Sequence, residues 1–411
     1  MNEKMLWQYA RLVIGVGINV QKGQPVMVNC PVECAEFGRL LAKAAFEAGA
    51  KDVYMNWRDD FISREHWLHA DDSVFDAAPV WDVLMRNELA KEGVGCISVS
   101  ATDPENLKGV DPDRLRRWGA AAGRDYKDFS KKMMANVLPW CVVSVPIPSW
   151  AKKVFPGVPA EEAMEKLWDA IFKTVRITED GDAVEAWRGH CANIEGKAKA
   201  MTGFDFEELH YENSLGTDLY VKMPENNVWL AGGDICRTGV KFVANMPTEE
   251  VFSAPLKTGV NGVLYASKPL VLHGNIVDGI KLTFKDGRIV DIHADTNEET
   301  LRTEVELDEG SHYLGEIALV PYDSPISNSG ILFFNTLFDE NASCHFAFGE
   351  AYPSCVKGGE ELSSEELLEK GLNAESSTHV DFMVGTSDLT ITGRTRDGRT
   401  VKVFENGNFA I

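Results

Sequence analysis

Side chains of the types that bind metal ions gather in the last third of the sequence. Two of them, His379 and Asp381, are two residues apart in an apolar run, His-Val-Asp-Phe-Met. On a β-strand, residues i and i+2 point to the same face, so both could bind one cation or two adjacent cations. The whole set comprises two imidazoles and three carboxylates: Glu250, Glu316, His345, His379 and Asp381. Such a set fits a pair of divalent cations that share a bridging carboxylate and a water molecule, and it therefore predicts metal-assisted hydrolysis.

Each of these residues has an ordinary structural explanation when it is taken alone. A single glutamate is nearly always a solvated surface residue. A single histidine beside apolar residues is more often a hydrogen-bonded core residue than a metal ligand, and a His-x-Asp pair is common. The residue types and their spacing alone leave both a metal site and a structural role open.

Four sequence blocks around the candidate ligands resemble successive blocks of the aminopeptidase T family of metallopeptidases. The blocks are Asn-Met-Pro-Thr-Glu-Glu-Val-Phe-Ser-Ala-Pro at 245–255, Gly-Glu at 315–316, Phe-Asp-Glu-Asn-Ala-Ser-Cys-His at 338–345 and His-Val-Asp-Phe-Met-Val-Gly at 379–385. Their order and separations also resemble that family, most specifically over residues 245–385. Residue 253 is Ser where the family pattern has Thr, and this conservative change leaves the set of candidate ligands complete.

The resemblance implies a metal-dependent aminopeptidase with a two-metal site. In that family the site is built from two Glu, two His and one Asp, which fall by position on the five residues named above. A nearby tyrosine of the family falls on Tyr352, in the run Gly-Glu-Ala-Tyr. The resemblance also implies an elongated homodimer and a site that opens onto an internal cavity. The expected cofactors are two divalent metal ions, zinc or cobalt, with manganese or magnesium as alternatives.

The expected reaction is the attack of an activated water molecule on the scissile peptide carbonyl. Glu316 is expected to act as the general base in preference to Glu250. Tyr352 is expected either to donate a hydrogen bond to the oxyanion or to bind a metal ion directly. Asp339 and Glu340 are the candidates for binding the free ammonium group of the peptide substrate.

Two other functions could use the same ligands. One is a metal-dependent amidohydrolase that acts on a non-peptide acyl substrate, and the other is a catalytically silent dimer stabilised by its metal. Structural metal sites tend to be closed, single-metal and rich in thiolates, so mixed carboxylate and imidazole ligands favour a hydrolytic pair. Release of N-terminal residues from peptides is therefore the function that the sequence favours.

The elements that must position these residues are expected to form two domains. Over residues 1–200, strands alternate with helices, and this alternation predicts an α/β domain with a mostly parallel sheet. The expected strands lie at 25–30, 52–57, 95–100 and 140–145, and the expected helices at 34–50, 76–92, 112–137 and 161–175. This N-terminal domain is expected to provide dimer contacts or to control access to the site.

Residues 201–411 are expected to form a mixed α+β, strand-rich catalytic domain that carries the metal site. Short strands are separated there by Gly, Asn and Asp, which favours a curved or barrel-like sheet with helices at 298–308 and 363–373. The pairs Asp286-Gly, Asp397-Gly and Asn406-Gly predict hairpin turns.

The composition of the chain limits the classes of partner and the cell compartment that we expect for the protein. The net charge of −22 and the pI near 4.9 disfavour nucleic acid and anionic membrane surfaces as partners. No apolar run reaches the roughly 18 residues that a membrane-spanning helix needs. The eight cysteines are scattered singly, which is typical of buried thiols in a reducing compartment. With no recognisable secretory signal at the start of the sequence, we expect a cytoplasmic protein.

Overall fold

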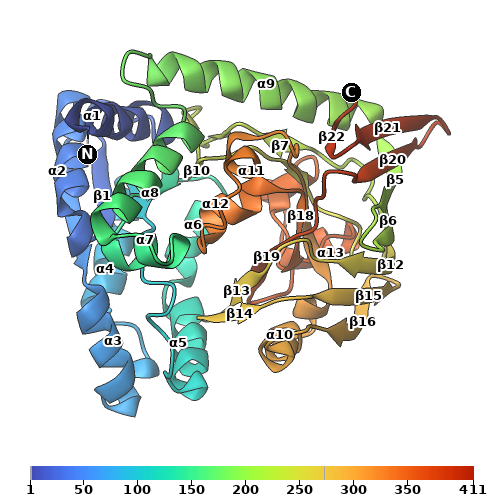
Figure 1. Cartoon of the computed structure of the whole chain (residues 1–411), viewed down its shortest axis with the longest axis horizontal. Helices are drawn as coiled ribbons and strands as arrows, with labels where there is room; N and C mark the ends of the chain where they lie inside the picture. Colours follow the sequence, from blue (N-terminus) through green and yellow to red (C-terminus); the bar gives the residue numbers. More distant parts are fainter. Residues whose placement is uncertain (1, 273) are drawn as a thin grey trace. The chain divides into compact units, whose positions relative to one another are not determined.

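The computed structural model describes residues 2–272 and 274–411, which divide into two compact units (Figure 1). The first unit combines the chain up to Gly189 with Gly233–Pro247, and the second combines His190–Gly232 with Thr248–Ile411. The sequence predicts a single boundary near residue 200, whereas the chain crosses between the units three times. The return of the chain to the first unit has a specific cause, because β10 (Asn245–Met246) pairs there with β4 (Trp140–Val143).

The first unit contains the parallel sheet that the sequence predicts. Its strand order is β10-β4-β3-β1-β2, and every neighbouring pair is parallel. The other three strands are β1 (Pro25–Pro31), β2 (Asp52–Arg58) and β3 (Gly95–Val99). A separate two-stranded hairpin joins β8 (Asp234–Ile235) and β9 (Lys241–Phe242).

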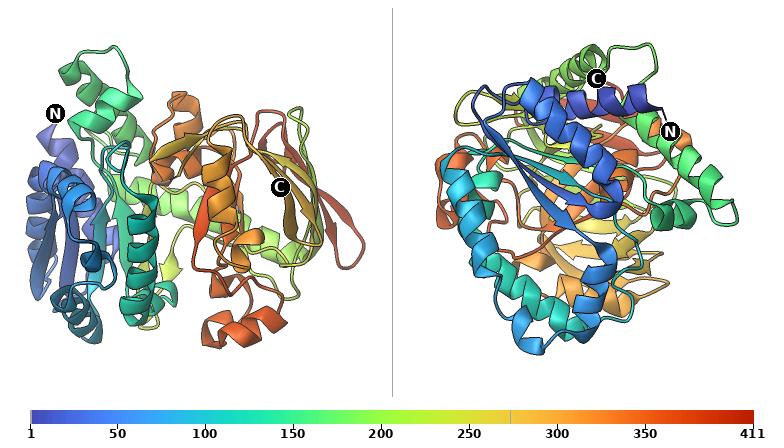
Figure 2. Two further views of the ribbon diagram at one scale, coloured as in Figure 1. Left: turned by 90° about the horizontal axis from the view of Figure 1, so that it is seen from below. Right: turned by 90° about the vertical axis from the view of Figure 1, so that its left-hand side faces the viewer.

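Helices pack on both faces of this sheet. A Cβ atom on Gly38, in α2 (Ala35–Glu47), would come within 3.2 Å of the side chains of Cys30 and Trp57, so glycine allows a close approach of the helix. On the opposite face, Leu89 and Phe129 pack near Met27. These two residues belong to α4 (Val80–Lys91) and α6 (Lys127–Met134). Figure 2 (right) shows α1 and α2 in front of the strands. The remaining helices that begin in this unit are α1 (Glu3–Leu12), α3 (Asp60–His69), α5 (Pro112–Asp125), α7 (Pro148–Val154), α8 (Ala160–Thr174) and α9 (Ala183–Phe204).

The second unit is built on antiparallel sheets. The larger sheet has eight strands in the order β16-β15-β12-β6-β5-β20-β21-β22 and is curved (Figure 2, left). These strands are β5 (Phe206–Glu212), β6 (Asp218–Lys222), β12 (Val260–Tyr265), β15 (Lys281–Lys285), β16 (Arg288–His293), β20 (Thr390–Thr395), β21 (Thr400–Glu405) and β22 (Asn408–Phe409). A small hairpin joins β13 (Leu270–Leu272) to β14 (Asn275–Val277).

The smaller sheet has five strands and carries the candidate metal ligands. Its order is β19-β18-β17-β11-β7, and all of its pairs are antiparallel. The strands are β7 (Leu230–Ala231), β11 (Val251–Ser253), β17 (Leu314–Leu319), β18 (His345–Gly349) and β19 (His379–Met383). The helices that follow β16 are α10 (Glu298–Val305), α11 (Pro325–Ser329), α12 (Thr336–Asp339) and α13 (Ser364–Glu369).

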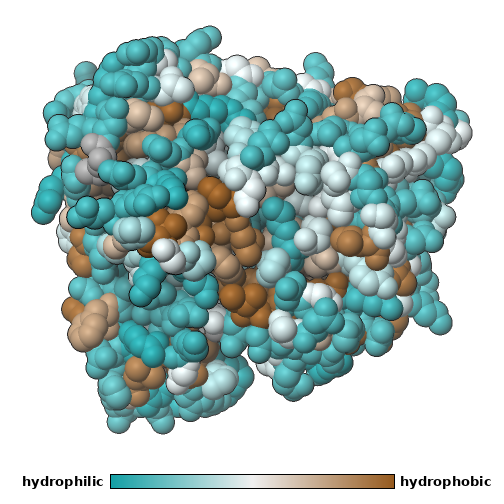
Figure 3. Space-filling model, viewed as in Figure 1, coloured by the Kyte–Doolittle hydropathy of each residue, from teal (hydrophilic) through white to brown (hydrophobic). Residues whose placement is uncertain are grey.

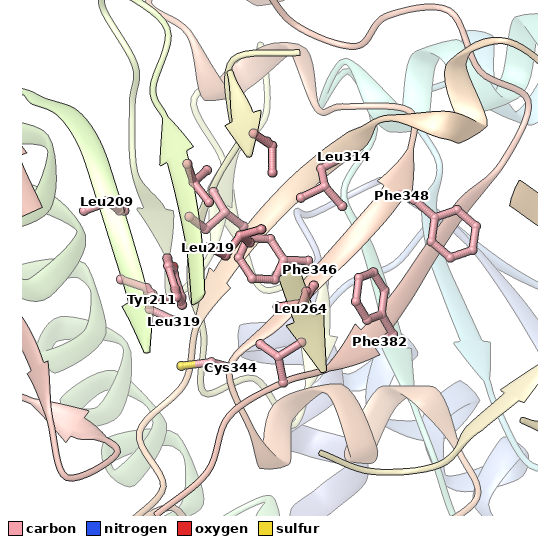
Figure 4. Close-up of a cluster of buried hydrophobic side chains, with 14 of the residues drawn as sticks. Leu209, Tyr211, Leu219, Leu264, Leu314, Leu319, Cys344, Phe346, Phe348 and Phe382 are labelled. Atoms are coloured by element: carbon pink, nitrogen blue, oxygen red, sulfur yellow. The ribbon is translucent and has the colours of Figure 1, made fainter. Parts of the chain in front are cut away.

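The core of the second unit lies against one face of the smaller sheet. Phe346, Phe348 and Phe382 point into it together with Leu314 and Leu319 (Figure 4). The rings of Phe348 and Phe382 lie 6.0 Å apart between centroids. Burial of such aromatic side chains, each worth about 1.5–3 kcal/mol relative to exposure, anchors the strands that hold the site.

The surface is mostly hydrophilic on the face that Figure 3 shows, and hydrophobic residues reach it in smaller areas. Within the described ranges, no helix combines the length and the apolar character needed to span a membrane.

Candidate metal centre

The register of the smaller sheet brings the candidate ligands onto one face. Glu316 in β17 lies opposite Ala347 in β18, and Ala347 lies opposite Asp381 in β19. Two pairs further along, and so on the same face, His379 lies opposite Gly349. Directly opposed residues of antiparallel strands share a face, and small residues in the central strand leave room between the ligands. The side chains that alternate with them, such as Phe346, point into the apolar core.

A β-bulge at Gly315 turns Glu316 onto the ligand face. Leu314 pairs with Phe348 and Glu316 pairs with Ala347, so β17 has one more residue than β18 at this point. Without the bulge, Leu314 and Glu316 would share a face, but Leu314 belongs to the core. A side chain on Gly315 would collide with the carbonyl oxygen of Gly349, so glycine is needed there.

The carboxylate of Glu316 lies between the two imidazoles. Its Oε1 atom is 3.7 Å from Nε2 of His345, and its Oε2 atom is 3.3 Å from Nε2 of His379. Two further carboxylates complete the two ends of the cluster. Oε2 of Glu250 lies 3.3 Å from Nε2 of His345, and Oδ1 of Asp381 lies 3.5 Å from Nε2 of His379.

The five residues form two overlapping groups of three. The first group is Glu250, Glu316 and His345, and the second is Glu316, His379 and Asp381. Within each group, one ligand atom of every residue lies within 4.8 Å of the others. A mixed set of oxygen and imidazole donors at these separations fits divalent cations, and Glu316 belongs to both groups as a bridging ligand would.

Backbone carbonyl groups orient both imidazoles. Nδ1 of His345 lies 3.1 Å from the carbonyl oxygen of Ser343, and Nδ1 of His379 lies 2.7 Å from that of Glu350. When each Nδ1–H donates to its carbonyl oxygen, the lone pair of each neutral ring is on Nε2, which faces the carboxylates. Hydrogen bonds of this kind, which hold each imidazole ring in a fixed orientation, are typical of histidines that bind metal ions.

Mutual contacts perturb the ionisation of the cluster in the absence of metal. Burial disfavours ionised Glu316, but hydrogen bonds from the two imidazoles outweigh burial and lower the pKa of Glu316 to about 2. Burial raises the pKa of Glu250, and His345 offsets this only in part. Burial alone would lower the pKa of His345 and His379, yet the carboxylates raise both above their ordinary value of 6.5. The cluster therefore favours positive charge at its centre, supplied by protons or by cations.

Tyr352 lies at the edge of this cluster. Its ring centroid is 5.4 Å from that of His379 and 5.9 Å from that of Phe252. Burial, followed by the negative charges of Glu316 and Asp381, raises the pKa of Tyr352 well above 10. The hydroxyl group therefore keeps its proton and can donate a hydrogen bond.

The two candidate residues for the substrate amine differ in their contacts. Oδ1 of Asp339 accepts from the backbone N–H of Phe333 at 2.8 Å, and Oδ2 accepts from that of Asn335 at 3.0 Å. Asp339 thus holds the preceding loop in place. Burial raises the pKa of Glu340 far above 4.5, and the nearby charges of Asp381 and Glu250 raise it further. Glu340 therefore lies beside the ligand cluster.

Two residues near the cluster were not expected from the sequence. Asn341 is fully buried, accepts from the backbone N–H of Glu249 at 2.8 Å and donates to Oε1 of Glu340 at 3.3 Å. Nε2 of His190 lies 3.7 Å from the Glu249 carboxylate and 2.7 Å from the Thr248 carbonyl oxygen. These contacts hold the backbone just before Glu250. Asn341 could have been noticed beside Glu340, but His190 is too distant in the sequence.

The comparisons with known proteins agree with the geometry. The profile of the family described as Thermophilic metalloprotease (M29) matches residues 2–409. The chain is 48% identical to Aminopeptidase AmpS of Bacillus subtilis (strain 168), over 98% of this chain and 97% of that protein. It is 38% identical to Aminopeptidase T of Thermus aquaticus, over 98% of this chain and 97% of that protein.

A solved structure extends this similarity to the whole fold. The wild-type AmpT from Thermus thermophilus superposes with a TM-score of 0.92 at 36% identity and covers 100% of both chains. The resemblance indicated by the four sequence blocks is thus confirmed over the full length. The chain therefore belongs to the M29 family of metalloproteases and is a hydrolase of the aminopeptidase class.

Proposed function

We propose that this protein is a two-metal aminopeptidase that releases N-terminal amino acids from peptides. The observation that carries the proposal is the position of Glu316, whose two oxygens face the imidazoles of His345 and His379 separately. Glu250, His345 and one oxygen of Glu316 would hold one cation, and the other oxygen, His379 and Asp381 would hold the second. Zinc or cobalt suits these ligands, with manganese or magnesium as alternatives.

When bound, the metal pair lowers the pKa of a water molecule and polarises the scissile carbonyl group. The protein side chains then act on protons and on the oxyanion. In this proposal Glu316 takes a proton from the attacking water through an oxygen that does not hold a cation at that moment, and passes the proton to the leaving amine. Tyr352, which keeps its own proton, donates a hydrogen bond to the tetrahedral oxyanion. A hydroxyl donor aimed at developing charge contributes more in a buried site than in water.

Glu340 is the residue that we propose to bind the free ammonium group of the substrate. It lies beside the ligands, and its Oε1 accepts a single hydrogen bond from Asn341 at 3.3 Å, so acceptor capacity remains for an ammonium group. Asp339 is a poorer candidate because both of its oxygens already accept backbone hydrogen bonds.

We further propose a cytoplasmic homodimer, which the first unit helps to form. All eight cysteines are buried, as expected for thiols in a reducing compartment. Helices α3 and α4 expose Phe61, Ile62 and Trp81, whose exposed fractions are 73%, 65% and 76%. Large exposed apolar side chains of this kind favour a contact with another chain. Sedimentation of the wild type beside Phe61→Glu and Trp81→Glu variants tests this part of the proposal.

The catalytic proposal is tested with aminoacyl-p-nitroanilides and their N-acetylated counterparts. The substrates are assayed after chelation and again with zinc, cobalt, manganese or magnesium restored. We expect cleavage of the free-amine substrates only, its loss on chelation and its recovery with metal. Cleavage of the acetylated substrates at similar rates would instead support an amidohydrolase. Metal analysis of the recovered enzyme should give two ions per chain.

A further inference from the structure

A lysine beside the site has no anionic partner among the residues that the structure describes. Ser267 and Lys268 lie between β12 and β13, and the backbone N–H of Ser267 donates to the carbonyl oxygen of Met383 at 2.8 Å. Met383 is the last residue of β19, two residues after Asp381, and it lies opposite His345. The segment is therefore tied to the end of the strand that carries two candidate ligands.

The two side chains of this segment have no polar partner in the described part of the chain. Lys268 is half-buried, and across residues 2–272 and 274–411 its ammonium group forms no hydrogen bond or ion pair. The buried Oγ atom of Ser267 likewise has no hydrogen-bond partner there. Burial lowers the pKa of Lys268, and the charge of Asp339 counteracts this. A partly buried cation and a buried hydroxyl in adjacent residues together suit an anionic group from outside the protein.

Asp339 does not take this role. The negative charge of Asp339 acts on the pKa of Lys268, but the two oxygens of Asp339 already accept hydrogen bonds from the backbone N–H groups of Phe333 and Asn335. Among the described residues no salt bridge joins the two side chains. Asp339 instead helps to locate Lys268, because the residue that follows Asp339 is Glu340. Lys268 therefore lies near Asp339, the residue that directly precedes Glu340 in the chain.

We propose that Lys268 and Ser267 bind the C-terminal carboxylate of short peptides, so that di- and tripeptides are the preferred substrate class. This inference rests on the proposed function, in which Glu340 binds the N-terminal ammonium group. Glu340 and Lys268 would then bind the two charged ends of one substrate, the ammonium group and the carboxylate respectively. An extended dipeptide spans roughly 7 Å and a tripeptide roughly 10 Å, and in this proposal peptides of that length would reach both Glu340 and Lys268.

The charges around the site favour a carboxylate over a neutral group as the partner of Lys268. Glu250, Glu316, Glu340 and Asp381 make the site strongly acidic, and a lysine there is the exception. A longer peptide would place a neutral amide beside Lys268 and leave the ammonium group unpaired. A hydrogen bond between charged groups is about twice as strong as one between neutral groups, so the free carboxylate should bind better.

The test compares Leu-Gly with its C-terminal amide as substrates of the metal-loaded wild type, Lys268→Met and Lys285→Met. Lys285 is an exposed residue at the end of β15 and is the charge-matched control. We expect Lys268→Met to lower kcat/KM for Leu-Gly by about tenfold or more. The same variant should change kcat/KM for the amide by less than about twofold, and Lys285→Met should affect neither substrate. Equal losses on both substrates, or none on either, would overturn the inference.

A binding measurement separates this role from a structural one. Titration calorimetry with a reduced-bond Leu-Gly analogue and its C-terminal amide reports affinity without turnover. We expect the wild type to prefer the free carboxylate and Lys268→Met to lose the preference while keeping its melting temperature. A wild type that cleaves aminoacyl-p-nitroanilides but does not discriminate the amide overturns this inference alone. Failure to cleave any free-amine substrate overturns the proposed function itself.

Discussion

Oε2 of Glu316 lies 3.3 Å from Nε2 of His379, although the two residues are on strands that do not pair with each other. β18 separates their strands, and between Glu316, Asp381 and His379 the residues of β18 on this face are Ala347 and Gly349. Long acidic and imidazole side chains can therefore reach across the small side chains of the central strand. The site depends as much on these small residues as on the ligands.

Replacement of Glu316 by Gln should abolish both catalysis and the binding of the second metal ion. The amide keeps the size of the side chain but cannot take a proton and is a weak bridging ligand. We expect kcat to fall by about 10²–10⁴-fold with an unchanged circular dichroism spectrum. Metal analysis should show fewer than two ions per chain, and Glu365→Gln on exposed helix α13 serves as the control. A Glu316→Gln enzyme with near-normal kcat would remove this residue from the mechanism.

Replacement of Ala347 by Leu should prevent metal binding without touching any ligand. Ala347 is fully buried and lies opposite both Glu316 and Asp381, so a larger side chain would occupy the space between them. The neighbouring Phe348 points to the apolar core, and Phe348→Leu is the matched control. We expect the control to retain metal but to lose stability, by roughly 1–1.5 kcal/mol. Calorimetric titration with metal would contradict the prediction if Ala347→Leu bound as well as the wild type.

Glu340 and Asp339 should respond differently to amide substitution. Glu340→Gln removes the charge proposed to bind the substrate ammonium group, so KM for free-amine substrates should rise about tenfold or more. Asp339→Asn weakens the hydrogen bonds to Phe333 and Asn335, so the main effect should be a loss of about 1–3 kcal/mol in unfolding free energy. Steady-state kinetics and urea unfolding of both variants give the comparison. The assignment fails if Asp339→Asn raises KM and Glu340→Gln does not.

The stability of the metal-free protein should decrease as the pH rises from neutral. Neighbouring carboxylates raise the pKa of His345 and His379 above 6.5 in the folded chain. Their stabilising contribution is therefore complete below about pH 6.5 and is lost as the pH rises through the raised folded-state values. The pKa of Glu250 and that of Glu340 are also raised, which acts in the same direction above about pH 4.5.

Metal binding requires neutral imidazoles, so bound metal should stabilise the protein more at higher pH. Melting temperatures measured from pH 6 to 9, with chelator and with zinc, test this linkage. The difference between the two series should widen with pH. A His345→Gln variant should flatten the pH dependence in chelator, and a constant difference in the wild type would speak against the linkage.

Local sequence patterns were sufficient for several features. His379 and Asp381 could be assigned to one face because the period of a strand is two residues, and the structure places both on β19. The turn at Asp286-Gly287 has φ values of 49° and 83°, and that at Asn406-Gly407 has 51° and 70°. Such positive φ values suit Asn, Asp and Gly, so these hairpins follow from residue types alone.

Other features depend on contacts between distant parts of the chain. The segment 112–137 has helical character throughout, yet it divides into α5 and α6 at Tyr126. The hydroxyl group of Tyr126 donates to Asp82 at 2.6 Å, and the Asp125 carboxylate accepts from the backbone of Ala78 at 2.8 Å. No local pattern contains these partners. The pairing of β10 with β4 is likewise a long-range contact, and it returns residues 233–247 to the first unit.

The sequence by itself determined which residue types were available for the site, and the spacing of one pair of them. Only the tertiary structure decided how they meet. The bulge at Gly315 turns Glu316 away from the core that receives Leu314, and two backbone hydrogen bonds occupy Asp339 while Glu340 lies beside the ligands. The physical reason is that both properties depend on partners that are distant in the sequence. The pairing of a strand decides toward which face each of its side chains points, and the hydrogen bonds of a carboxylate decide whether its oxygens can still accept a further bond.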